Sequence, residues 1–255
     1  MSTPDLFQLL PEHDRGQAPL TDPELAGLYA YPEAPQRFVR ANMVATIDGA
    51  ATGINGLSGG INNAADYRVF RVLRALAQVV VVGAQTARAE GYRNIAAPSE
   101  HAGLRAASGI TKPLEFAIVT RSGIVPGHTL AHGDDVPAPI VLTTAAGRNR
   151  LLADHPHARC VVADRDGSVD LAEAISHLAA LGLTRVLCEG GPSLLAQMID
   201  QGLVDEVCLT TVGLLQPGAH PGITSHTGLT PSAHEATLGS LLVSDSTLIA
   251  KWLVP

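Results

Sequence analysis

Hydrophobic positions recur along the chain with two different periods, and these periods predict its secondary structure. Short apolar runs that contain valine and other β-branched residues are typical of strands covered on both faces. They occupy residues 37–46, 78–83, 114–120, 138–144, 158–163, 184–190 and 205–213. Between these runs, apolar residues recur at helical spacing. The predicted helices span residues 62–77, 84–90, 148–155, 170–182 and 192–202.

The order of these elements predicts the class of fold. Strands that alternate with helices form a mostly parallel sheet with helices on both faces. Residues 239–254 have a different pattern, which indicates a hairpin that turns around Asp245 and adds antiparallel strands at one edge. The sequence therefore predicts an α/β protein with a mostly parallel central sheet, helices on both faces and an antiparallel C-terminal hairpin.

Two segments between the predicted elements are unusually long, and the first 36 residues differ in composition from the rest. Residues 92–113 and 214–233 are rich in Gly, Pro, Ser and His, so we expect functional or mobile loops there. Residues 1–36 contain six prolines. They predict an extended arm that wraps a surface, with one short helical turn near residues 22–29, or alternatively a loosely packed arm. A single domain is expected to follow at 37–255.

Composition and charge narrow the class of protein. Of 255 residues, 46% are hydrophobic and 16% are charged, which indicates a packed chain. The net charge of -7 argues against a nucleic-acid partner, which requires a basic face. No apolar run approaches the roughly 20 residues of a membrane span, and no signal peptide is visible, so we expect a cytoplasmic protein. Cys160, Cys188 and Cys208 lie in apolar runs without C-x-x-C spacing, which favours reduced core thiols and no metal site.

The stretch "LCEGGPSLLAQMID" (187–200) places two glycines between a buried strand and a helix. Such a junction exposes backbone N–H groups and the positive end of a helix dipole. Without a Cβ at Gly190 and Gly191, a pyrophosphate can approach the main chain closely. Pro192 suits a first helical position, and Ser193 adds a hydroxyl donor. A tight turn without any ligand explains the same residues. Since neither G-x-G-x-x-G nor G-x-x-x-x-G-K-[ST] occurs, a standard Rossmann site and a P-loop are not indicated.

Three further positions follow predicted strands, where α/β sheets bind their ligands. Asp48 could accept hydrogen bonds from an amino-pyrimidine or a ribose, although a turn alone explains an Asp-Gly pair. Thr86 begins a helix, and its hydroxyl could donate to a phosphate or cap the helix. Arg121, beside Thr120, suits the 2′-phosphate of NADP, and a solvated turn is the alternative.

Four motifs occur in a characteristic order: "TIDG" (46–49), "LRALAQVVVVGAQTARAEGY" (73–92), "IVTRSG" (118–123) and "VLCEGGPSLLAQMIDQGLVDEVCLT" (186–210). With them, residues 37–255 resemble the reductase domain of riboflavin biosynthesis, the pyrimidine reductase family. The resemblance implies a dihydrofolate-reductase-like fold, NADPH as the cofactor and a homodimer. It also implies hydride transfer to a small sugar-phosphate pyrimidine such as 5-amino-6-(5-phosphoribosylamino)uracil.

The same resemblance assigns roles to individual positions. Asp48 and Glu189 would orient the substrate and stabilise a developing positive charge, so they are the predicted catalytic residues. Asn42, Ser58 and Arg74 would face the substrate. The cofactor would be lined by Ala45, Thr86, Glu90, Thr120, Arg121, Gly190, Gly191, Pro192, Ser193 and Leu194.

The chain departs from the family's pattern at two places. Asn42 stands where the riboflavin enzymes usually carry a lysine, which removes a positive charge from the predicted ribose-phosphate contact. "EGY" (90–92) stands where the family commonly has D-D-P, so Glu90 and Tyr92 reshape the pocket rim. The H-x-E and P-C-x-x-C ligands of a zinc deaminase are absent, which indicates a stand-alone reductase. Two alternatives stay open: a reductase of a pterin, folate or other small heterocycle, and a non-catalytic nucleotide-binding sensor.

Overall fold

The computed structural model describes residues 3–10, 18–33, 37–93, 95–133, 136–226, 228–230 and 232–255. At its centre is a ten-stranded sheet. In spatial order the strands are β1 (Phe7–Leu10), β11 (Thr237–Ser244), β12 (Thr247–Leu253), β10 (Glu206–Val212), β2 (Phe38–Thr46), β9 (Arg185–Cys188), β3 (Val79–Gly83), β4 (Glu115–Thr120), β5 (Ile140–Thr143) and β6 (Arg159–Val162). A separate ribbon pairs β7 (Asp164–Arg165) with β8 (Ser168–Val169).

The sheet has a parallel part and an antiparallel part. All neighbouring strands from β10 through β2, β9, β3, β4 and β5 to β6 are parallel. β12, β11 and β1 extend the sheet beyond β10 in antiparallel pairs. The turn of the β11–β12 hairpin contains Asp245, whose φ is 46°. The predicted fold class, a mostly parallel sheet with an antiparallel C-terminal hairpin, is confirmed.

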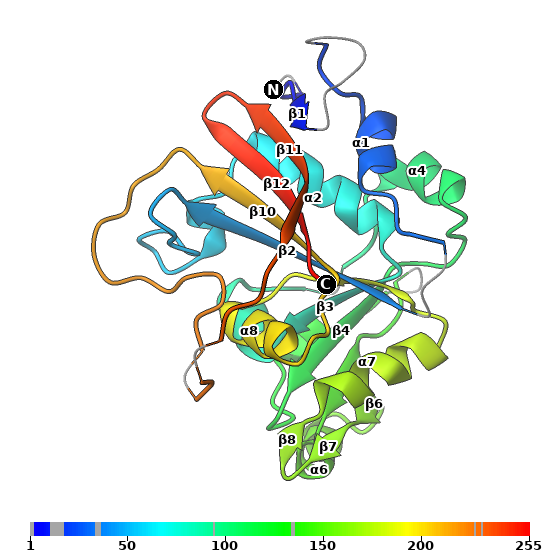
Figure 1. The fold of residues 1–255 in the computed structure, drawn as a ribbon. Coiled ribbons are helices and arrows are strands. Elements are labelled where there is room, and N and C mark those ends of the chain that lie inside the picture. Colours follow the sequence, from blue (N-terminus) through cyan, green and yellow to red (C-terminus); the bar gives the residue numbers. More distant parts are fainter. Residues whose placement is uncertain are drawn as a thin grey trace.

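Helices cover both faces of the sheet (Figure 1). One face carries α2 (Ala64–Leu76), which contacts α1 (Asp22–Leu28) and α4 (Ala102–Ala107). The opposite face carries α7 (Leu171–Ala180) and α8 (Pro192–Asp200). The shorter helices are α3 (Ala84–Ala89), α5 (Gly127–Leu130) and α6 (Ala145–Asp154), and two 3-10 turns span Ser58–Gly60 and Ser99–His101.

The valine run of β3 explains why both faces are covered. Successive side chains of a strand point to opposite faces. Val80 and Val82 therefore join the core cluster that contains α2, whereas Val79 and Val81 join the cluster that contains α7 and α8. All four valines are buried, so neither face of this strand can meet water.

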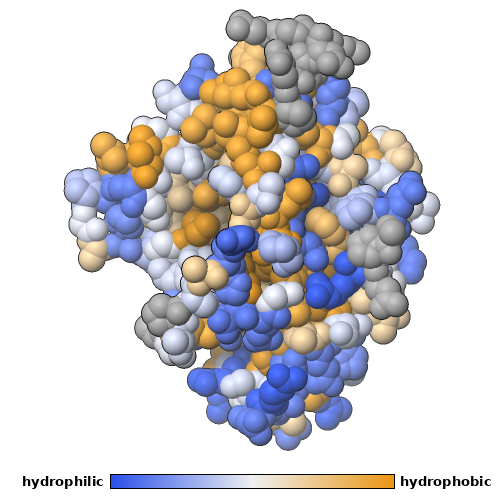
Figure 2. Space-filling view, viewed as in Figure 1, coloured by the Kyte–Doolittle hydropathy of each residue, from blue (hydrophilic) through white to orange (hydrophobic). Residues whose placement is uncertain are grey.

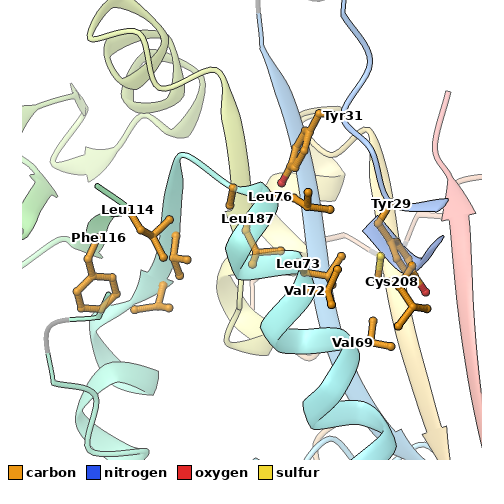
Figure 3. Packing of buried hydrophobic residues seen from close by; sticks show 14 of the residues in the cluster. Tyr29, Tyr31, Val69, Val72, Leu73, Leu76, Leu114, Phe116, Leu187 and Cys208 are labelled. Carbon is orange, nitrogen blue, oxygen red and sulfur yellow. The ribbon is translucent and has the colours of Figure 1, made fainter. Parts of the chain in front are cut away.

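The predicted apolar stripe of α2 faces the sheet. Asn63 caps the helix, because its side-chain oxygen accepts hydrogen bonds from the backbone N–H groups of Ala65 and Asp66. The stripe points toward Leu187 and Cys208 of the sheet (Figure 3). It consists of Val69, Val72, Leu73 and Leu76.

The expectation of loose packing for the N-terminal arm is wrong for residues 3–10 and 18–33. β1 pairs with β11, and α1, which confirms the helical turn near residues 22–29, packs on α2. Leu6, Leu25 and Tyr29 are fully buried, and the Tyr29 carbonyl accepts a hydrogen bond from the buried Arg40 (2.8 Å). These side chains cover apolar surface of α2 that would otherwise meet water. The division of the chain at residue 36 stays a prediction.

The two long segments differ from one another. Residues 92–113 contain α4, so the expectation of a loop is only partly right. The Arg105 guanidinium of α4 donates to the carbonyls of Ala75 (3.0 Å) and Ala77 (2.7 Å), where α2 ends and leaves carbonyls without helical partners. The described residues between 214 and 233 form no helix or strand. They return to the end of β2, where the Ile47 N–H donates to the Leu214 carbonyl (2.9 Å).

Candidate active site

A cleft of about 970 Å³ opens at the carboxyl ends of the parallel strands. Residues of β2, β3 and β4 line it, together with the first residues of α3 and α8 and the segment that follows β9. In an open α/β sheet, this is the edge at which ligands bind. α2 and the 214–233 segment close the cleft on the side of β2, through residues that include Asp66, Phe70, Pro221 and His226.

The turn between β9 and α8 depends on both of its glycines. Gly190 has φ 80°, which favours glycine, and the peptide bond to Gly191 is cis. A Cβ on Gly191 would overlap the Thr86 hydroxyl. The Gly83 N–H donates to the Gly190 carbonyl (2.8 Å), which ties the turn to the end of β3. The glycine pair therefore has a packing reason that is independent of any ligand.

The same turn also leaves polar groups free for a ligand. Gly191 is the N-cap of α8 and has no side chain with which to satisfy the first N–H groups of the helix. Gly191, Pro192, Ser193 and Leu194 all line the cleft. The nine-residue helix thus presents its uncapped, positive end to the cleft, as an anion site requires.

Glu189 lies directly before this turn and is 8% exposed. Both of its oxygens are paired with the Arg74 guanidinium, whose Nε and Nη2 donate at 2.7 Å each. The Tyr92 hydroxyl donates to the same carboxylate (2.9 Å). Because three donors from two other segments converge on it, Glu189 has a fixed orientation in the wall of the cleft.

The partners of Glu189 have shifted pKa values. Burial alone would lower the pKa of Arg74, but the adjacent Glu189 carboxylate raises it above its usual value. Burial and the Glu189 carboxylate raise the pKa of Tyr92 well above its usual value. Arg74 is therefore charged and Tyr92 holds its proton throughout the neutral range, so the three donors persist.

A second polar group lies at the end of β4. Thr120, Arg121 and Ser122 line the cleft, and the Thr120 and Ser122 hydroxyls are 3.5 Å apart. Thr86 and Arg88, from the neighbouring α3, line the cleft as well. We call Thr120, Arg121 and Ser122 the Arg121 group. Their hydroxyls and guanidinium, with those of Thr86 and Arg88, can donate hydrogen bonds to the oxygens of a phosphate monoester.

On the side of β2, three predicted residues line the cleft: Asn42, Ser58 and Glu90. The Ser58 N–H donates to the Glu90 carboxylate (2.7 Å), so Glu90 holds the loop of residues 56–60, which contains three glycines, against the end of α3. Asn42 lies on β2 itself, and its amide is a neutral group that can both donate and accept hydrogen bonds.

Four predicted residues do not line the cleft. Ala45 is buried in β2, and Gly190 and Arg74 lie behind Gly191 and Glu189. The Asp48 carboxylate accepts hydrogen bonds from the Thr46 hydroxyl (2.5 Å) and from the Gln216 N–H (2.8 Å), and His220 lies 3.9 Å away. The Thr46 hydroxyl holds the pKa of Asp48 below its usual value.

These contacts give Asp48 a task that the sequence did not reveal. Its carboxylate fastens the 214–222 segment, which carries the cleft-lining Pro221, to the end of β2. The Ala51 N–H, which donates to the Pro221 carbonyl (2.9 Å), supports the same arrangement. The role of Asp48 in orienting the substrate stays a prediction.

Asp66 is the cleft-lining carboxyl that sequence reasoning missed. It lies in the first turn of α2 and is 3% exposed. Burial raises the pKa of Asp66 to about 6. The helical spacing in the sequence could have indicated this burial. Asp66 precedes Val69 and Phe70 by three and four residues, so it lies on the same, buried side of the helix. An acid at such a position is rarely buried without a reason.

Two absences hold for the described part of the chain. No three residues among its histidines, cysteines, aspartates and glutamates are grouped so that they could hold a metal ion. None of its helices combines the length and the apolar character that a membrane crossing requires.

The sequence matches the model of the RibD C-terminal domain over residues 37–239. The chain therefore belongs to the RibD C-terminal domain family. One relative is the 2,5-diamino-6-ribosylamino-4(3H)-pyrimidinone 5′-phosphate reductase of Methanothermobacter thermautotrophicus. It is 29% identical over 178 residues, which are 67% of this chain and 74% of the relative.

Solved structures agree on the fold. A pyrimidine reductase-like protein from Corynebacterium diphtheriae superposes with a TM-score of 0.78 at 23% identity, over 90% of this chain and 98% of that one. The riboflavin biosynthesis reductase Rib7 of Saccharomyces cerevisiae gives a TM-score of 0.67 at 13% identity, over 91% and 99% of the two chains. RibD from Acinetobacter baumannii gives a TM-score of 0.65 at 18% identity, and the match covers 86% of this chain and 58% of RibD.

Proposed function

We propose that the chain is an NADPH-dependent reductase of riboflavin biosynthesis that acts on a phosphoribosylamino-pyrimidine such as 5-amino-6-(5-phosphoribosylamino)uracil. The observation that carries the proposal is the division of one cleft into two chemical parts. The uncapped start of α8 and the Arg121 group suit a dinucleotide, and the fixed Glu189 carboxylate suits a polar substrate beside it. Membership of the family supports the reaction class.

The residues present fit the cofactor. The pyrophosphate would bind the first turn of α8, where Gly191 through Leu194 line the cleft and no side chain caps the helix. The 2′-phosphate would bind Arg121 and the hydroxyls of Thr120 and Ser122. When bound, the nicotinamide supplies the hydride.

The protein's own groups orient the substrate and handle charge. Glu189 faces the cleft as a carboxylate whose geometry is fixed by Arg74 and Tyr92, so it can accept a hydrogen bond from a substrate N–H or O–H and stabilise a positive charge that develops on the reacting carbon. Asp48 holds the 214–222 segment in place and, through a water molecule, would relay a proton. Asn42 and Ser58 would bind the ribose-phosphate chain.

The test is the consumption of NADPH, followed by the absorbance of its nicotinamide, with 5-amino-6-(5-phosphoribosylamino)uracil as the substrate. A parallel reaction contains NADH in place of NADPH. We expect turnover with NADPH and much less with NADH. Turnover with dihydropterins but with no pyrimidine would favour the pterin reductase. Tight NADPH binding without oxidation by any pyrimidine or pterin would overturn the enzymatic proposal and favour a sensor.

We also propose that two copies of the chain form a homodimer through the antiparallel strands. The face of these strands opposite α2 carries half-buried or exposed apolar side chains, of which Leu209 and Trp252 pack partly against the core cluster that contains α8. In the sheet register, Leu241, Ala250 and Leu209 lie side by side, and Val243 lies beside Leu248. Apolar residues gather on the surface where the β11–β12 hairpin lies (Figure 2). Such a patch is typical of a protein interface.

A cytoplasmic location completes the proposal. Cys160, Cys188 and Cys208 are free cysteines, and two of them are fully buried in the core. Free thiols persist in a reducing compartment, where NADPH and phosphorylated sugars are also found.

A further inference from the structure

The short helix α3 lies between the two chemical parts of the cleft and contacts both of them. In its first turn, the Thr86 hydroxyl lies so close to Gly191 that a Cβ on this glycine would overlap it. At its other end, the C-cap residue Glu90 accepts a hydrogen bond from the Ser58 N–H (2.7 Å). One helix of six residues therefore joins the turn where the dinucleotide is proposed to bind to the loop on the side of β2.

The loop that Glu90 holds, residues 52–60, is bonded mainly to itself. The Leu57 carbonyl accepts hydrogen bonds from the N–H groups of Gly53 (2.9 Å) and Gly60 (3.1 Å). A Cβ on Gly60 would lie 3.2 Å from the Gly53 Cα, so these two stretches of backbone pack directly against one another. The internal bonds make the loop one unit, and its position depends on what holds it from outside.

Glu90 is the side chain that holds this unit. Among the described residues, no other side chain outside the loop accepts a hydrogen bond from residues 52–60. Ser58 begins a 3-10 turn whose N-cap, Leu57, provides no side-chain acceptor. The Glu90 carboxylate supplies the missing acceptor from another segment. Because this acceptor is charged, the hydrogen bond is stronger than one between neutral groups.

Both partners of this bond line the cleft, and so do Thr86 and Arg88 of α3. Ser58 is one of the proposed contacts of the ribose-phosphate chain, whereas Thr86 and Arg88 lie on the side of the proposed dinucleotide. Glu90 therefore fixes the position of a substrate contact while it belongs to an element that a cofactor would touch.

We infer that Glu90 is a positioning residue through which binding of the cofactor strengthens binding of the substrate. This inference rests on the proposed function and adds a coupling between its two binding sites. A dinucleotide that lies on the start of α8 and against Thr86 fixes α3, and with it the Glu90 carboxylate that accepts the Ser58 N–H. The loop is then ordered before the substrate arrives, so substrate binding no longer has to supply the free energy of this ordering.

Calorimetric titration measures the coupling without turnover, since NADP⁺ carries no hydride to transfer. 5-Amino-6-(5-phosphoribosylamino)uracil is titrated into the full chain with and without saturating NADP⁺. We expect at least about fivefold tighter binding in the presence of NADP⁺, which is the lower end of the range typical of coupled sites. Equal affinities would overturn the inference.

Variants connect the coupling to the residue. Glu90→Ala removes the acceptor, so the ratio of the two affinities should fall to about one. Glu90→Gln retains a neutral oxygen acceptor and should give an intermediate ratio. Glu173→Ala, at an exposed glutamate of α7, is the matched control and should leave the ratio unchanged. A ratio that both changes at Glu90 leave intact would show that Glu90 has no part in the coupling.

Hydrogen exchange, followed by mass spectrometry, tests whether the coupling acts through the loop. NADP⁺ alone should slow amide exchange in residues 52–60 of the unchanged chain by at least about threefold, because an ordered loop opens less often. In Glu90→Ala, NADP⁺ should leave this exchange unaltered. Equal protection of both chains would indicate direct contact between NADP⁺ and the loop, and it would overturn the inference, as would a lack of protection in the unchanged chain.

The two measurements separate this inference from the proposed function. If no pyrimidine is reduced by NADPH while NADP⁺ still orders the loop through Glu90, the proposed function fails and the role of Glu90 stands. If pyrimidines are reduced but neither the affinity ratio nor the exchange depends on Glu90, the inference fails and the function stands.

Discussion

Glu189 shows how a single residue can be identified from sequence and yet owe its geometry to distant partners. Its position after a buried strand and before two glycines is evident in the sequence. Its orientation depends on Arg74 of α2 and on Tyr92, which lie 115 and 97 residues away. Substitutions of single residues therefore test the proposed site most directly.

Glu189→Gln removes the negative charge but keeps the shape of the side chain. We expect kcat to fall by at least about 100-fold, because a neutral amide cannot stabilise a developing positive charge. The Kd for NADPH should stay within about threefold, since the dinucleotide residues are elsewhere. Nicotinamide fluorescence and steady-state kinetics measure the two quantities. Glu115→Gln, at an ion pair with Arg159 on the rim of the sheet, is the control. Equal losses in kcat and in NADPH affinity would contradict the assignment.

Arg121→Ala tests the contact with the 2′-phosphate. Because NADH lacks this phosphate, the variant should bind NADPH about tenfold or more weakly and NADH almost unchanged. Both affinities are measured by fluorescence titration. Arg150→Ala, on an exposed turn of α6, controls for the loss of one surface charge. Parallel losses for NADPH and NADH would assign the 2′-phosphate to another residue.

Asp66→Asn should raise the free energy of unfolding by an amount that depends on pH. The folded chain holds the proton of Asp66 up to about pH 6, against 3.8 for a free side chain. A raised carboxyl pKa contributes stability below pH 3.8 that is lost as the pH rises through 6. We therefore expect Asp66→Asn to be more stable than the unchanged chain at pH 7.5, by about 1–3 kcal/mol, with little difference at pH 4. Urea unfolding at the two pH values measures this. A destabilised variant at pH 7.5 would contradict it.

At the scale of elements, short strands and helices that depend on distant partners were the hardest to predict. β2, β3, α2, α7 and α8 have clear periods, and all lie where the sequence placed them. β1 has four residues and exists because it pairs with β11, some 230 residues further along the chain. No local period reveals such a pairing. α4 likewise has six residues, and its fixed position comes from Arg105 at the end of α2.

The turn between β9 and α8 allows the packing reason for its glycines to be measured. Gly191→Ala adds a methyl group that overlaps the Thr86 hydroxyl, so we expect a loss of about 1–3 kcal/mol in the free energy of unfolding. Thr86→Ala removes the hydroxyl, and the double variant should recover part of the loss. A double-mutant cycle in urea gives the coupling. A neutral Gly191→Ala, or additive effects in the double variant, would show that Thr86 does not restrict this position.

At the scale of the whole molecule, the apolar face of the antiparallel strands opposite α2 predicts association. Light scattering after gel filtration should give twice the 26.5 kDa of one chain. Leu248→Glu places a charge on that face, where the side chain is 43% exposed, and should shift the mass to 26.5 kDa without unfolding the chain. Ile54→Glu, at a position that is 97% exposed, is the control. A monomeric unchanged chain would contradict the dimer.

The sequence by itself determined the order of strands and helices, the class of fold and most of the residues near the cleft. It could do so because each predicted strand and helix carries its own period, and because ligands of parallel sheets bind where strands end and helices begin. Thr86, Thr120, Arg121 and Gly191 were all found through this rule.

Only the tertiary structure decided which of these side chains reach the cleft and what each one touches. Asp48 and Glu189 follow strands in the same way, yet Asp48 fastens the 214–222 segment and Glu189 lines the wall. The helical spacing of α2 could have shown that Asp66 is buried, but its contact with Thr210 of β10 comes from a segment far away in the sequence. Contacts between distant segments leave no local period, and it is these contacts that fix burial, ion pairing and pKa.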